Sequence, residues 1–553
     1  MRISRGNGNI DALRSAPILA VDTETVNTND LTMIGIGVFY NDTDGIYFSV
    51  FPEQDTFIPE LMSIISSKER TKIWHNGISF DLEVLDRFAQ EEGFSPPDDV
   101  NFQDSEIMAK VSGLPGGLQR IGEEWLGATD LFSIKDLFEE SGTRNMLDVP
   151  IERVAEKCLN DCRTTWQLYQ NRERVLSDRQ RYCYEIDRRL IPVLRNLQTK
   201  GLGLRQGVLE EHQDRLQRDI LRIRRECEYE GIENPGSNVQ VGFVLASRGC
   251  KLPFTKGARR QLRVNEEVLE ELDDPLAKVI LEYRGKSKLL STYVIPWLGK
   301  DRAYTHFRLD LATGRLASGA INAWDKVNRN LQNIPPVMRE VFRPDNSIWS
   351  WADHGQIELR TLAYMSRDER MVDEYKKAEP DLHSITAKAG GVDRSAGKTF
   401  NFAMVYGASN KMLARRTGVR LERIQGMREA WRELYPGAQS WINRQFFNHN
   451  GEWVEDDFGR RMRLPEPVEG AEVNMKAFQA HVGKCAVNYP IQGTAATIVK
   501  MGMLMIYEAG WDMKLQLHDE YLIDGSWEPD PKLAYIHPEL YTPFELKKGI
   551  IWS

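Results

Sequence analysis

The sequence predicts a multidomain α/β protein, and three observations support this fold class. Its 553 residues are 41% hydrophobic and 28% charged, a globular composition whose length suits two to four domains of roughly 100 to 200 residues. Short β-rich runs and helical patterns alternate in both halves. The charge is uneven, because residues 1–170 carry 14 Lys and Arg against 29 Asp and Glu, whereas the rest has a net charge of +6. We therefore expect an acidic module fused to a mildly basic one.

The elements of this fold follow from local patterns. The runs ILAVD, MIGIGVFY and IYFSV between residues 18 and 50 predict strands that begin a mixed sheet with antiparallel neighbours. Helical patterns at 57–67 and 151–176 complete one α/β unit of about 170 residues. From 178 to 297 the period is helical, with a long helical pair expected over 178–229 and another pair over 266–289. Beyond residue 302 strands and helices alternate, and LQLHDEYLI predicts a β-hairpin.

The composition also excludes several classes of protein. The longest apolar runs, such as APILAV, are far shorter than the roughly 18 residues of a membrane helix. The start MRISRGNGNI lacks the apolar stretch of a secretory signal, so we expect the chain to stay in the cytoplasm where it is made. Six cysteines without a CxxC pair suit a reducing compartment. The total charge of −9 by itself argues weakly against a nucleic-acid partner.

Four carboxylates stand out in the acidic module. Asp22 and Glu24 lie two residues apart at the end of an apolar strand and project from the same face of it. Such a pair, taken alone, is more often a solvated strand end. Asp81 in HNGISFDLEVL and Asp161 on a predicted helix change this balance. The four together form a set of the kind that two hard divalent cations require.

The C-terminal half offers a second pair of carboxylates. Asp353 ends an apolar strand in WSWADHGQIELRTLAYMS, where by itself it would be interpreted as a helix cap. His518, Asp519 and Glu520 lie in the predicted hairpin, and alone they would be only a polar turn. Taken together, Asp353 and Asp519 indicate a second two-metal site.

One helical stripe between these segments combines cations with aromatic rings. Arg394, Lys398, Phe402 and Tyr406 recur every four residues, with an Asp before the stripe and a Gly after it as expected caps. An amphipathic core helix would explain the aromatic residues but not the two cations. Cations near a helix N-terminus suit a triphosphate, and the aromatic end suits a base.

These motifs resemble two parts of one enzyme family. The triplet DTE, the N-x-x-x-F-D element and the late Asp resemble the three motifs of the 3′→5′ proofreading exonuclease domain, which has an RNase H-like fold. The three C-terminal segments resemble motifs A, B and C of family A DNA polymerases, the relatives of bacterial DNA polymerase I. Further similar segments occur in the family's order: TGRLAS, NRNLQNIPP, DLHSITA, FGRRMRLPE and NYPIQGTAA.

The resemblance implies a domain organisation. An RNase H-like exonuclease domain is expected over 1–175 and a right-hand polymerase domain over 176–553. Within the latter we expect these parts: thumb about 178–300, fingers about 376–484, and palm about 301–375 and 485–553. Because Asp22 lies so near the N-terminus, no 5′-nuclease is expected before it. This economy suggests a bacteriophage replicative enzyme that copies a viral genome.

The resemblance also implies the role of each site residue. In the exonuclease domain, two Mg²⁺ ions, with Mn²⁺ as a possible substitute, would be held by Asp22, Glu24, Asp81 and Asp161. In the polymerase domain, two Mg²⁺ ions would be held by Asp353 and Asp519 and supported by Glu520. The triphosphate would be bound by Arg394, Lys398 and His383, and the nucleotide pocket would be lined by Phe402, Tyr406, Gln356 and Glu358. The DNA minor groove would be contacted by Arg315, Asn488 and Gln492. His518 would lie near the primer terminus.

Four features bear on how closely this chain follows the family pattern, and three of them carry predictions. Lys157 stands where the family usually has Tyr, and we expect it to pair with Asp161 or approach the scissile phosphate and to weaken the exonuclease. His354 replaces a Tyr that would help to hold Glu358, which predicts weaker rejection of ribonucleotides. Phe402 predicts poor use of dideoxynucleotides. The proline-rich stretch SWEPDPKLAYIHPELY replaces the amphipathic helix expected before the last strand.

Two other classes of function stay open at this point. The chain could be a nuclease whose polymerase half only grips DNA, or an inactive DNA-binding protein, but a binding module would not need every catalytic residue named above. The expected partners are primer-template DNA, deoxynucleoside triphosphates, and a helicase, primase and single-strand-binding protein. We expect a monomer without membrane contact. Residues 401–450 carry 8 Lys and Arg against 3 Asp and Glu, which predicts salt-sensitive DNA binding.

Overall fold

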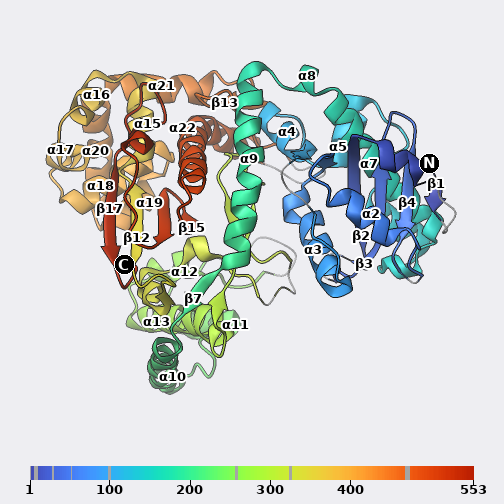
Figure 1. Ribbon diagram of the computed structural model, residues 1–553. Helices are drawn as coiled ribbons and strands as arrows, with labels where there is room; N and C mark the ends of the chain where they lie inside the picture. The colour runs from blue at the N-terminus through green and yellow to red at the C-terminus, as the bar shows by residue number, and fades with distance from the viewer. Residues whose placement is uncertain are drawn as a thin grey trace. The chain divides into compact units, whose positions relative to one another are not determined.

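The structure is a computed structural model of the chain (Figure 1). The described residues are 2–4, 10–27, 30–51, 53–97, 101–255, 260–322, 325, 327–467 and 474–553. They form two compact units that are built from separate stretches of the chain. Unit 1 comprises Met1–Lys200, Thr305–Gln332 and Ser350–Lys547, and unit 2 comprises Gly201–Tyr304, Asn333–Trp349 and Lys548–Ser553.

Unit 1 begins with a six-stranded mixed sheet in the order β1-β4-β3-β2-β5-β6. Its strands are β1 Arg2–Ser4, β2 Ile18–Thr25, β3 Met33–Phe39, β4 Gly45–Ser49, β5 Thr71–Trp74 and β6 Phe102–Asp104. The pairs β2–β3 and β3–β4 are antiparallel, and the other neighbours are parallel. The predicted mixed sheet with an antiparallel start is therefore present. β3 and β4 are buried along their whole length, which explains their continuous apolar sequences.

Helices cover this sheet, and one of them carries site residues. They are α1 Asp11–Ser15, α2 Ile58–Ile65, α3 Asp81–Glu92, α4 Ser105–Ser112, α5 Leu118–Ile121, α6 Ile134–Ser141, α7 Ile151–Gln170 and α8 Arg172–Val175. Helix α7 packs across β2, β3 and β4. It approaches β3 closely at Gly37, where a Cβ atom would lie 2.6 Å from Cys158 Sγ. The glycine thus allows α7 to bring its polar face to the end of β2.

The rest of unit 1 surrounds a four-stranded sheet in the order β15-β16-β12-β17. Its strands are β12 Trp349–His354, β15 Met513–Leu517, β16 Glu520–Asp524 and β17 Phe544–Gly549. Two short pairs lie outside this sheet: β9 His306–Arg308 pairs with β10 Ala317–Gly319, and β13 Trp453–Glu455 pairs with β14 Arg461–Arg463. The helices are α9 Asp178–Lys200, α15 Ile357–Ser366, α16 Glu369–Tyr375, α17 Leu382–Gly390, α18 Arg394–Val405, α19 Asn410–Thr417, α20 Leu421–Leu434, α21 Pro436–Phe447 and α22 Met475–Glu508. The core between α15 and α22 includes Leu362, Phe400, Trp431 and Ile491.

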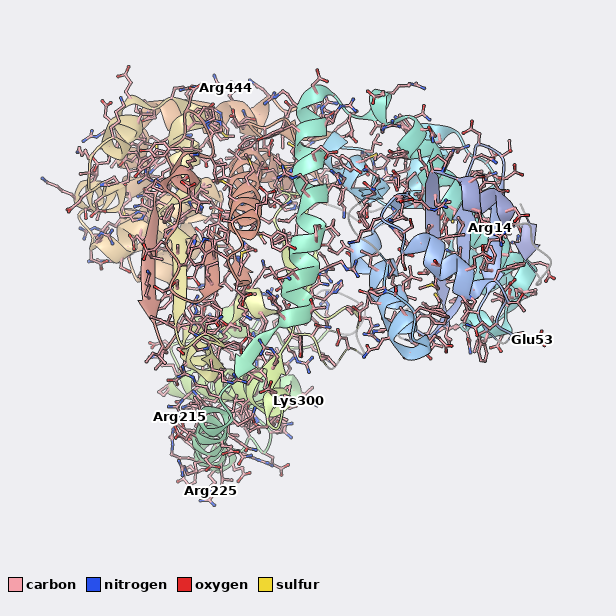
Figure 2. All side chains as sticks on the ribbon, in the orientation of Figure 1. Arg14, Glu53, Arg215, Arg225, Lys300 and Arg444 are labelled. Atoms are coloured by element: carbon pink, nitrogen blue, oxygen red, sulfur yellow. The ribbon has the colours of Figure 1, made fainter. Side chains whose placement is uncertain are left out.

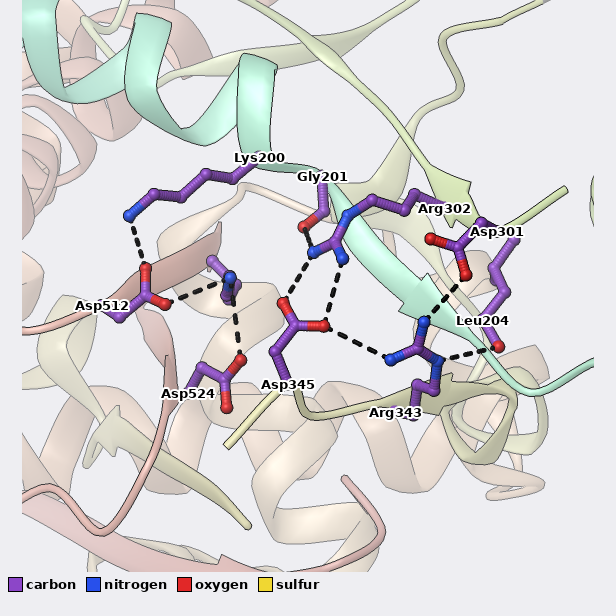
Figure 3. Close-up of polar contacts among 10 residues, drawn as sticks. Lys200, Gly201, Leu204, Asp301, Arg302, Arg343, Asp345, Asp512 and Asp524 are labelled. Atoms are coloured by element: carbon purple, nitrogen blue, oxygen red, sulfur yellow. Dashed lines mark hydrogen bonds and ion pairs between the residues drawn. The ribbon is translucent and has the colours of Figure 1, made fainter. Parts of the chain in front are cut away.

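Unit 2 is mainly helical around a small antiparallel sheet, β11-β7-β8. Its elements are β7 Leu202–Leu204, α10 Gln206–Tyr229, α11 Asn238–Ser247, α12 Glu266–Glu270, α13 Pro275–Leu289, α14 Ile295–Trp297, β8 Arg302–Ala303 and β11 Phe342–Arg343. Figure 3 shows how arginines tie this sheet together: Arg302 pairs with Asp345 at 2.8 Å, and Arg343 pairs with Asp301 at 2.8 Å. The helical pair expected over 266–289 corresponds to α12 and α13, and Pro275 starts the second of them.

Two further expectations can be compared with the structure. Residues 531–535 form only a short 3₁₀ turn, so the described chain has no amphipathic helix in the stretch between β16 and β17, in agreement with the sequence. Among the described helices, none combines the length and the apolar character needed to cross a membrane.

Candidate active sites

The two predicted polymerase carboxylates lie next to each other at the ends of neighbouring strands. Asp353 is near the end of β12, and Asp519 lies in the two-residue turn between β15 and β16, where His518 has a left-handed φ of 58°. The His354 N–H donates to the Asp519 carbonyl at 3.1 Å, which fixes the two segments together. Burial and the neighbouring Asp519 carboxyl, which shares a hydrogen bond, raise the pKa of Asp353 to about 7.

A cavity of about 580 Å³ opens beside these carboxyls within unit 1. It gathers most of the residues predicted for the polymerase site: Arg315, Asp353, Gln356, Glu358, His383, Arg394, Lys398, Phe402, Tyr406, His518 and Asp519. These come from five separate segments of the chain, so the fold brings together what the sequence keeps far apart. The carboxyls of Asp353 and Asp519 offer hard oxygen ligands that fit Mg²⁺.

Helix α18 supplies the positive wall of this cavity. The Asp393 side chain caps it by accepting from the Ala396 N–H at 2.8 Å, as predicted. Arg394 pairs with Asp381 at 2.9 Å. Burial alone would raise the pKa of Asp381, but hydrogen bonds, above all from the Arg394 guanidinium, lower this pKa to about 2. Burial, with Arg394 and Lys398 nearby, lowers the pKa of His383 to about 4. The histidine is therefore neutral at pH 7 and can accept or donate one hydrogen bond.

Glu358 is buried and held from two sides. The Tyr406 hydroxyl donates to its two carboxylate oxygens at 2.9 and 2.7 Å, and Arg315 forms an ion pair with it. His354 is fully buried and points elsewhere, with Nδ1 3.0 Å from the Thr542 carbonyl oxygen and Nε2 3.0 Å from the hydroxyl oxygen of Tyr521. The Glu358 contacts come instead from α18 and from Arg315. The prediction of weaker ribonucleotide rejection stays untested.

Three predicted residues lie outside the cavity lining. Glu520 starts β16 opposite Leu517 and is half-buried. Asn488 and Gln492 lie one turn apart on α22. The Asn488 Nδ2 atom is buried and has no hydrogen-bond partner among the described residues, so its donors are available to a group that the protein itself does not supply.

The structure adds residues that the sequence patterns did not single out. Glu545 of β17 lines the cavity and helps to raise the pKa of Asp353. A second cavity of about 600 Å³ shares Lys398, Phe402 and Tyr406 with the first and adds Lys484 and Arg416. The alternating run FELKKG contains Glu545, so the sequence offers a charged residue on a strand as a signal. The place of Glu545 beside Asp353, however, depends on the pairing of β17 with β12.

The second candidate site lies at the end of β2 in the N-terminal sheet. Asp22 and Glu24 are on β2, and atoms of Asp22, Glu24 and Cys158 lie within 4.8 Å of one another. Asp81 begins α3, where one of its oxygens accepts from the Thr23 N–H at 2.9 Å and from the Thr23 hydroxyl at 2.8 Å. Burial raises the pKa of Asp81 to about 7, although these hydrogen bonds lower it. The fold thus assembles the predicted carboxylates around one strand end.

Lys157 lies among these carboxylates. Its Nζ is 3.1 Å from Glu24 Oε1 and 2.8 Å from Asp161 Oδ2. The predicted pairing with Asp161 is therefore present, and the contact with Glu24 is an addition to it. The oxygen-rich group of Asp22 and Glu24 fits a hard divalent cation, whereas an ammonium already lies between Glu24 and Asp161.

Comparison with known families gives two matches to this chain. DNA polymerase family A matches residues 206–534, and the family described as 3′-5′ exonuclease matches residues 8–177. Similar curated proteins include DNA polymerase I of Caldicellulosiruptor bescii, 32% identical over 67% of this chain and 47% of that protein, and DNA polymerase I of Chloroflexus aurantiacus, 29% identical over 98% and 62%. The thermostable DNA polymerase I of Thermus aquaticus is 29% identical over 85% of this chain and 56% of that protein. The chain thus spans about half to three-fifths of the length of these relatives.

A solved structure supports the fold. The POL domain of Pol1 from M. smegmatis, in complex with DNA primer-template and dNTP, matches 100% of this chain and 99% of that chain with a TM-score of 0.75 and 20% identity. At this identity the likeness concerns the fold alone. Together with the two family matches, it confirms the predicted fold class of an exonuclease domain followed by a polymerase domain.

Proposed function

We propose that this chain, which belongs to DNA polymerase family A, adds deoxynucleotides to a primer 3′ end under the direction of a template, and that its N-terminal part removes nucleotides from that end. The observation that carries the proposal is the cavity that Asp353 and Asp519 line together with Arg394 and Lys398 of α18. Carboxylates for metal ions and cations for phosphates in one cavity are what phosphoryl transfer from a triphosphate substrate requires. The division into exonuclease 1–175 and polymerase 176–553 is part of this proposal.

The nucleotide is held by groups at fixed places on α18 and α15. Arg394 and Lys398 bind the triphosphate, and Asp381 orients Arg394 until the phosphates arrive. Neutral His383 donates a hydrogen bond to a phosphate oxygen. Phe402, and beside it Tyr406, offer the apolar surface for the base.

Selection against ribonucleotides follows from the position of Glu358. The side chain lines the cavity and is anchored by Tyr406, so the space beside the sugar is closed to a 2′-hydroxyl group. Gln356, with a left-handed φ of 57°, precedes α15 and directs its amide oxygen to the Tyr375 hydroxyl at 3.1 Å. The proposal retains poor use of dideoxynucleotides, which rests on Phe402. Ready chain termination by dideoxynucleotides would contradict it.

Asp353 and Asp519 hold two Mg²⁺ ions in this proposal, and Mn²⁺ can replace them. When bound, the metals lower the pKa of the primer 3′-hydroxyl and stabilise the leaving pyrophosphate. Glu520 and Glu545 add negative charge near the ions. Asp353, with a pKa of about 7, must lose its proton to bind metal, so metal affinity increases with pH through neutrality.

The primer-template is checked in its minor groove by side chains that find acceptors in every base pair. Asn488 has a buried donor without a partner among the described residues, and Gln492 lies one turn further along α22. Arg315 must leave its ion pair with Glu358 to reach the DNA. His518, exposed in its turn beside Asp519, lies near the primer terminus.

In the N-terminal part, Asp22, Glu24, Asp81 and Asp161 hold divalent cations for hydrolysis of the 3′-terminal phosphodiester. Thr23 positions Asp81 by donating two hydrogen bonds to it. Lys157 offers no neutral phenol donor to the attacking water, so we expect a slower exonuclease than one that has Tyr at this position.

The biological setting is a wider part of the proposal. Partners would be a helicase, a primase and a single-strand-binding protein in the cytoplasm, with the enzyme itself a monomer. The bacteriophage origin and the copying of a viral genome stay predictions, and the relatives named above are bacterial.

A labelled primer-template with Mg²⁺ tests the proposal directly. Extension with deoxynucleotides and shortening without them are expected. Asp353→Ala with Asp519→Ala should abolish only extension, and Asp22→Ala with Glu24→Ala only shortening. Asp373→Ala, which removes an exposed carboxylate of the same unit, should change neither activity. Shortening without extension in the parent chain would instead indicate a nuclease that only grips DNA, and neither activity would indicate a binding protein.

A further inference from the structure

The ammonium of Lys157 occupies a position inside the N-terminal carboxylate site. Its side chain is only 14% exposed, and its two partners Glu24 and Asp161 are 6% and 25% exposed. Nζ touches one oxygen of each, at 3.1 and 2.8 Å. The cation therefore bridges two of the four carboxylates that were expected to share divalent metal ions.

The fold holds Lys157 in this place. Lys157 and Asp161 lie one turn apart on α7 and share a face of that helix. Helix α7 packs against β2, which carries Glu24, so the lysine stem runs from the helix to the strand end.

We propose that Lys157 takes the place of one of two divalent cations, so that the exonuclease centre of this chain binds a single divalent cation. This inference rests on the proposed exonuclease function. A divalent ion that bridged Glu24 and Asp161 would have to lie about 2.0 to 2.6 Å from the same oxygens that the ammonium touches. Both cannot occupy that point, and their like charges repel each other.

Charge leads to the same conclusion. Four ionised carboxylates attract two divalent cations because the sum is neutral. Lys157 cancels one of these negative charges permanently, so the attraction for a second cation is smaller. The remaining ion belongs with Asp22 and the other carboxylate oxygen of Glu24, in the group of ligand atoms from Asp22, Glu24 and Cys158 that lie within 4.8 Å of one another.

Counting bound metal tests this inference independently of catalysis. The full chain would carry Asp353→Asn and Asp519→Asn, which empties the polymerase site, and would be mixed with a single-stranded oligonucleotide ending in phosphorothioate linkages. Bound Mn²⁺ per chain would be measured by electron paramagnetic resonance. We expect one Mn²⁺ with Lys157, two with Lys157→Met, and one with Lys157→Arg, which keeps the charge.

Lys135→Met is the matched control. Lys135 also lies on a helix of the same domain and has a carboxylate one turn away, Glu139 at 3.6 Å, but it is 81% exposed. It should leave the count at one. Equal counts with Lys157 and with Lys157→Met would overturn the inference, since the lysine would then move aside or have no effect.

Failure of the inference and failure of the proposed exonuclease are distinguishable. Two Mn²⁺ in every variant would refute the role of Lys157 while leaving the exonuclease intact. No Mn²⁺ in any variant would refute both. Circular dichroism of each variant shows whether a changed count reflects loss of fold, and the Lys157→Arg chain provides a folded comparison if Lys157→Met is unstable.

Discussion

Glu358 illustrates how a site residue depends on partners far from it in sequence. Its two oxygens accept hydrogen bonds from Tyr406, 48 residues later, and Arg315, 43 residues earlier, forms an ion pair with it. A hydrogen bond to a charged group contributes about 1.5 to 3 kcal/mol. Loss of the Tyr406 hydroxyl should therefore allow Glu358 to move away from the sugar.

The first prediction concerns ribonucleotide rejection. Tyr406→Phe should lower the preference for deoxynucleotides by at least about tenfold, because about 1.5 kcal/mol, the lower end of this range, corresponds to roughly that factor. The measurement is single-turnover incorporation of a ribonucleotide and of the matching deoxynucleotide. His354→Tyr is the comparison, because His354 faces Thr542 and Tyr521 rather than Glu358. A larger effect from His354→Tyr than from Tyr406→Phe would show that the assignment is wrong.

Residue types and spacing predicted the site better than they predicted its contacts. The periodic stripe of α18 and the Asp residues at strand ends are local patterns, and the structure places these side chains around one cavity. The Glu358 partners, the burial of His354 and the presence of Glu545 depend on which strands and segments pair across the fold. Such non-local pairings leave no trace in the spacing of residues along the chain.

At the scale of elements, a buried ionic cluster joins three parts of unit 1. Asp187 of α9 pairs with Arg460, which precedes β14, at 2.7 Å and with Lys500 of α22 at 2.8 Å. All three side chains are at most 4% exposed. The helical pair expected over 178–229 includes α9, but the charged contact that fixes α9 to α22 cannot be predicted from the helical period.

Removal of Asp187 should be strongly destabilising. Asp187→Asn leaves two buried cations with less compensation, which costs about 3 to 5 kcal/mol. The thermal unfolding midpoint of the full chain would report the loss. Asp345→Asn is the control, because Asp345 is 32% exposed and its ion pairs with Arg302 and Arg343 (Figure 3) lie in a partly solvated setting, where about 0 to 1 kcal/mol is expected. Equal losses in both variants would contradict this account.

The same cluster predicts a pH dependence. Burial alone would raise the pKa of Asp187, but Arg460 and Lys500 lower this pKa below its ordinary value. The native state therefore binds fewer protons than the unfolded state near that pKa, and the stabilising contribution is present above about pH 4 and decreases as the pH falls through the native pKa. The difference in unfolding midpoint between the parent and Asp187→Asn should be full at about pH 6 and smaller at about pH 3. A constant difference would exclude this linkage.

At the scale of the whole molecule, the distribution of charge is more informative than its total. The acidic surplus lies in residues 1–170, where it includes the carboxylates around Lys157, while the remainder has a net charge of +6. The cations of residues 401–450 include Arg416, which is exposed beside Lys484 at the second cavity. Figure 2 shows exposed basic side chains such as Arg215 and Arg225 of α10 in unit 2 as well.

The C-terminal part of the chain should therefore bind the DNA phosphates, and the affinity for DNA should fall as salt is added. The dissociation constant for a primer-template duplex should rise by at least about tenfold between about 50 and 200 mM salt, because each phosphate contact releases a counterion. Arg416→Ala should reduce the slope of log K against log salt by about one if Arg416 contacts a phosphate. Arg14→Ala removes an arginine of the acidic module (Figure 2). Arg14 is already paired with Glu60, so the change should leave the slope unchanged. If both variants reduce the slope equally, the duplex also contacts the acidic module, and the division of roles between the two parts of the chain would have to be abandoned.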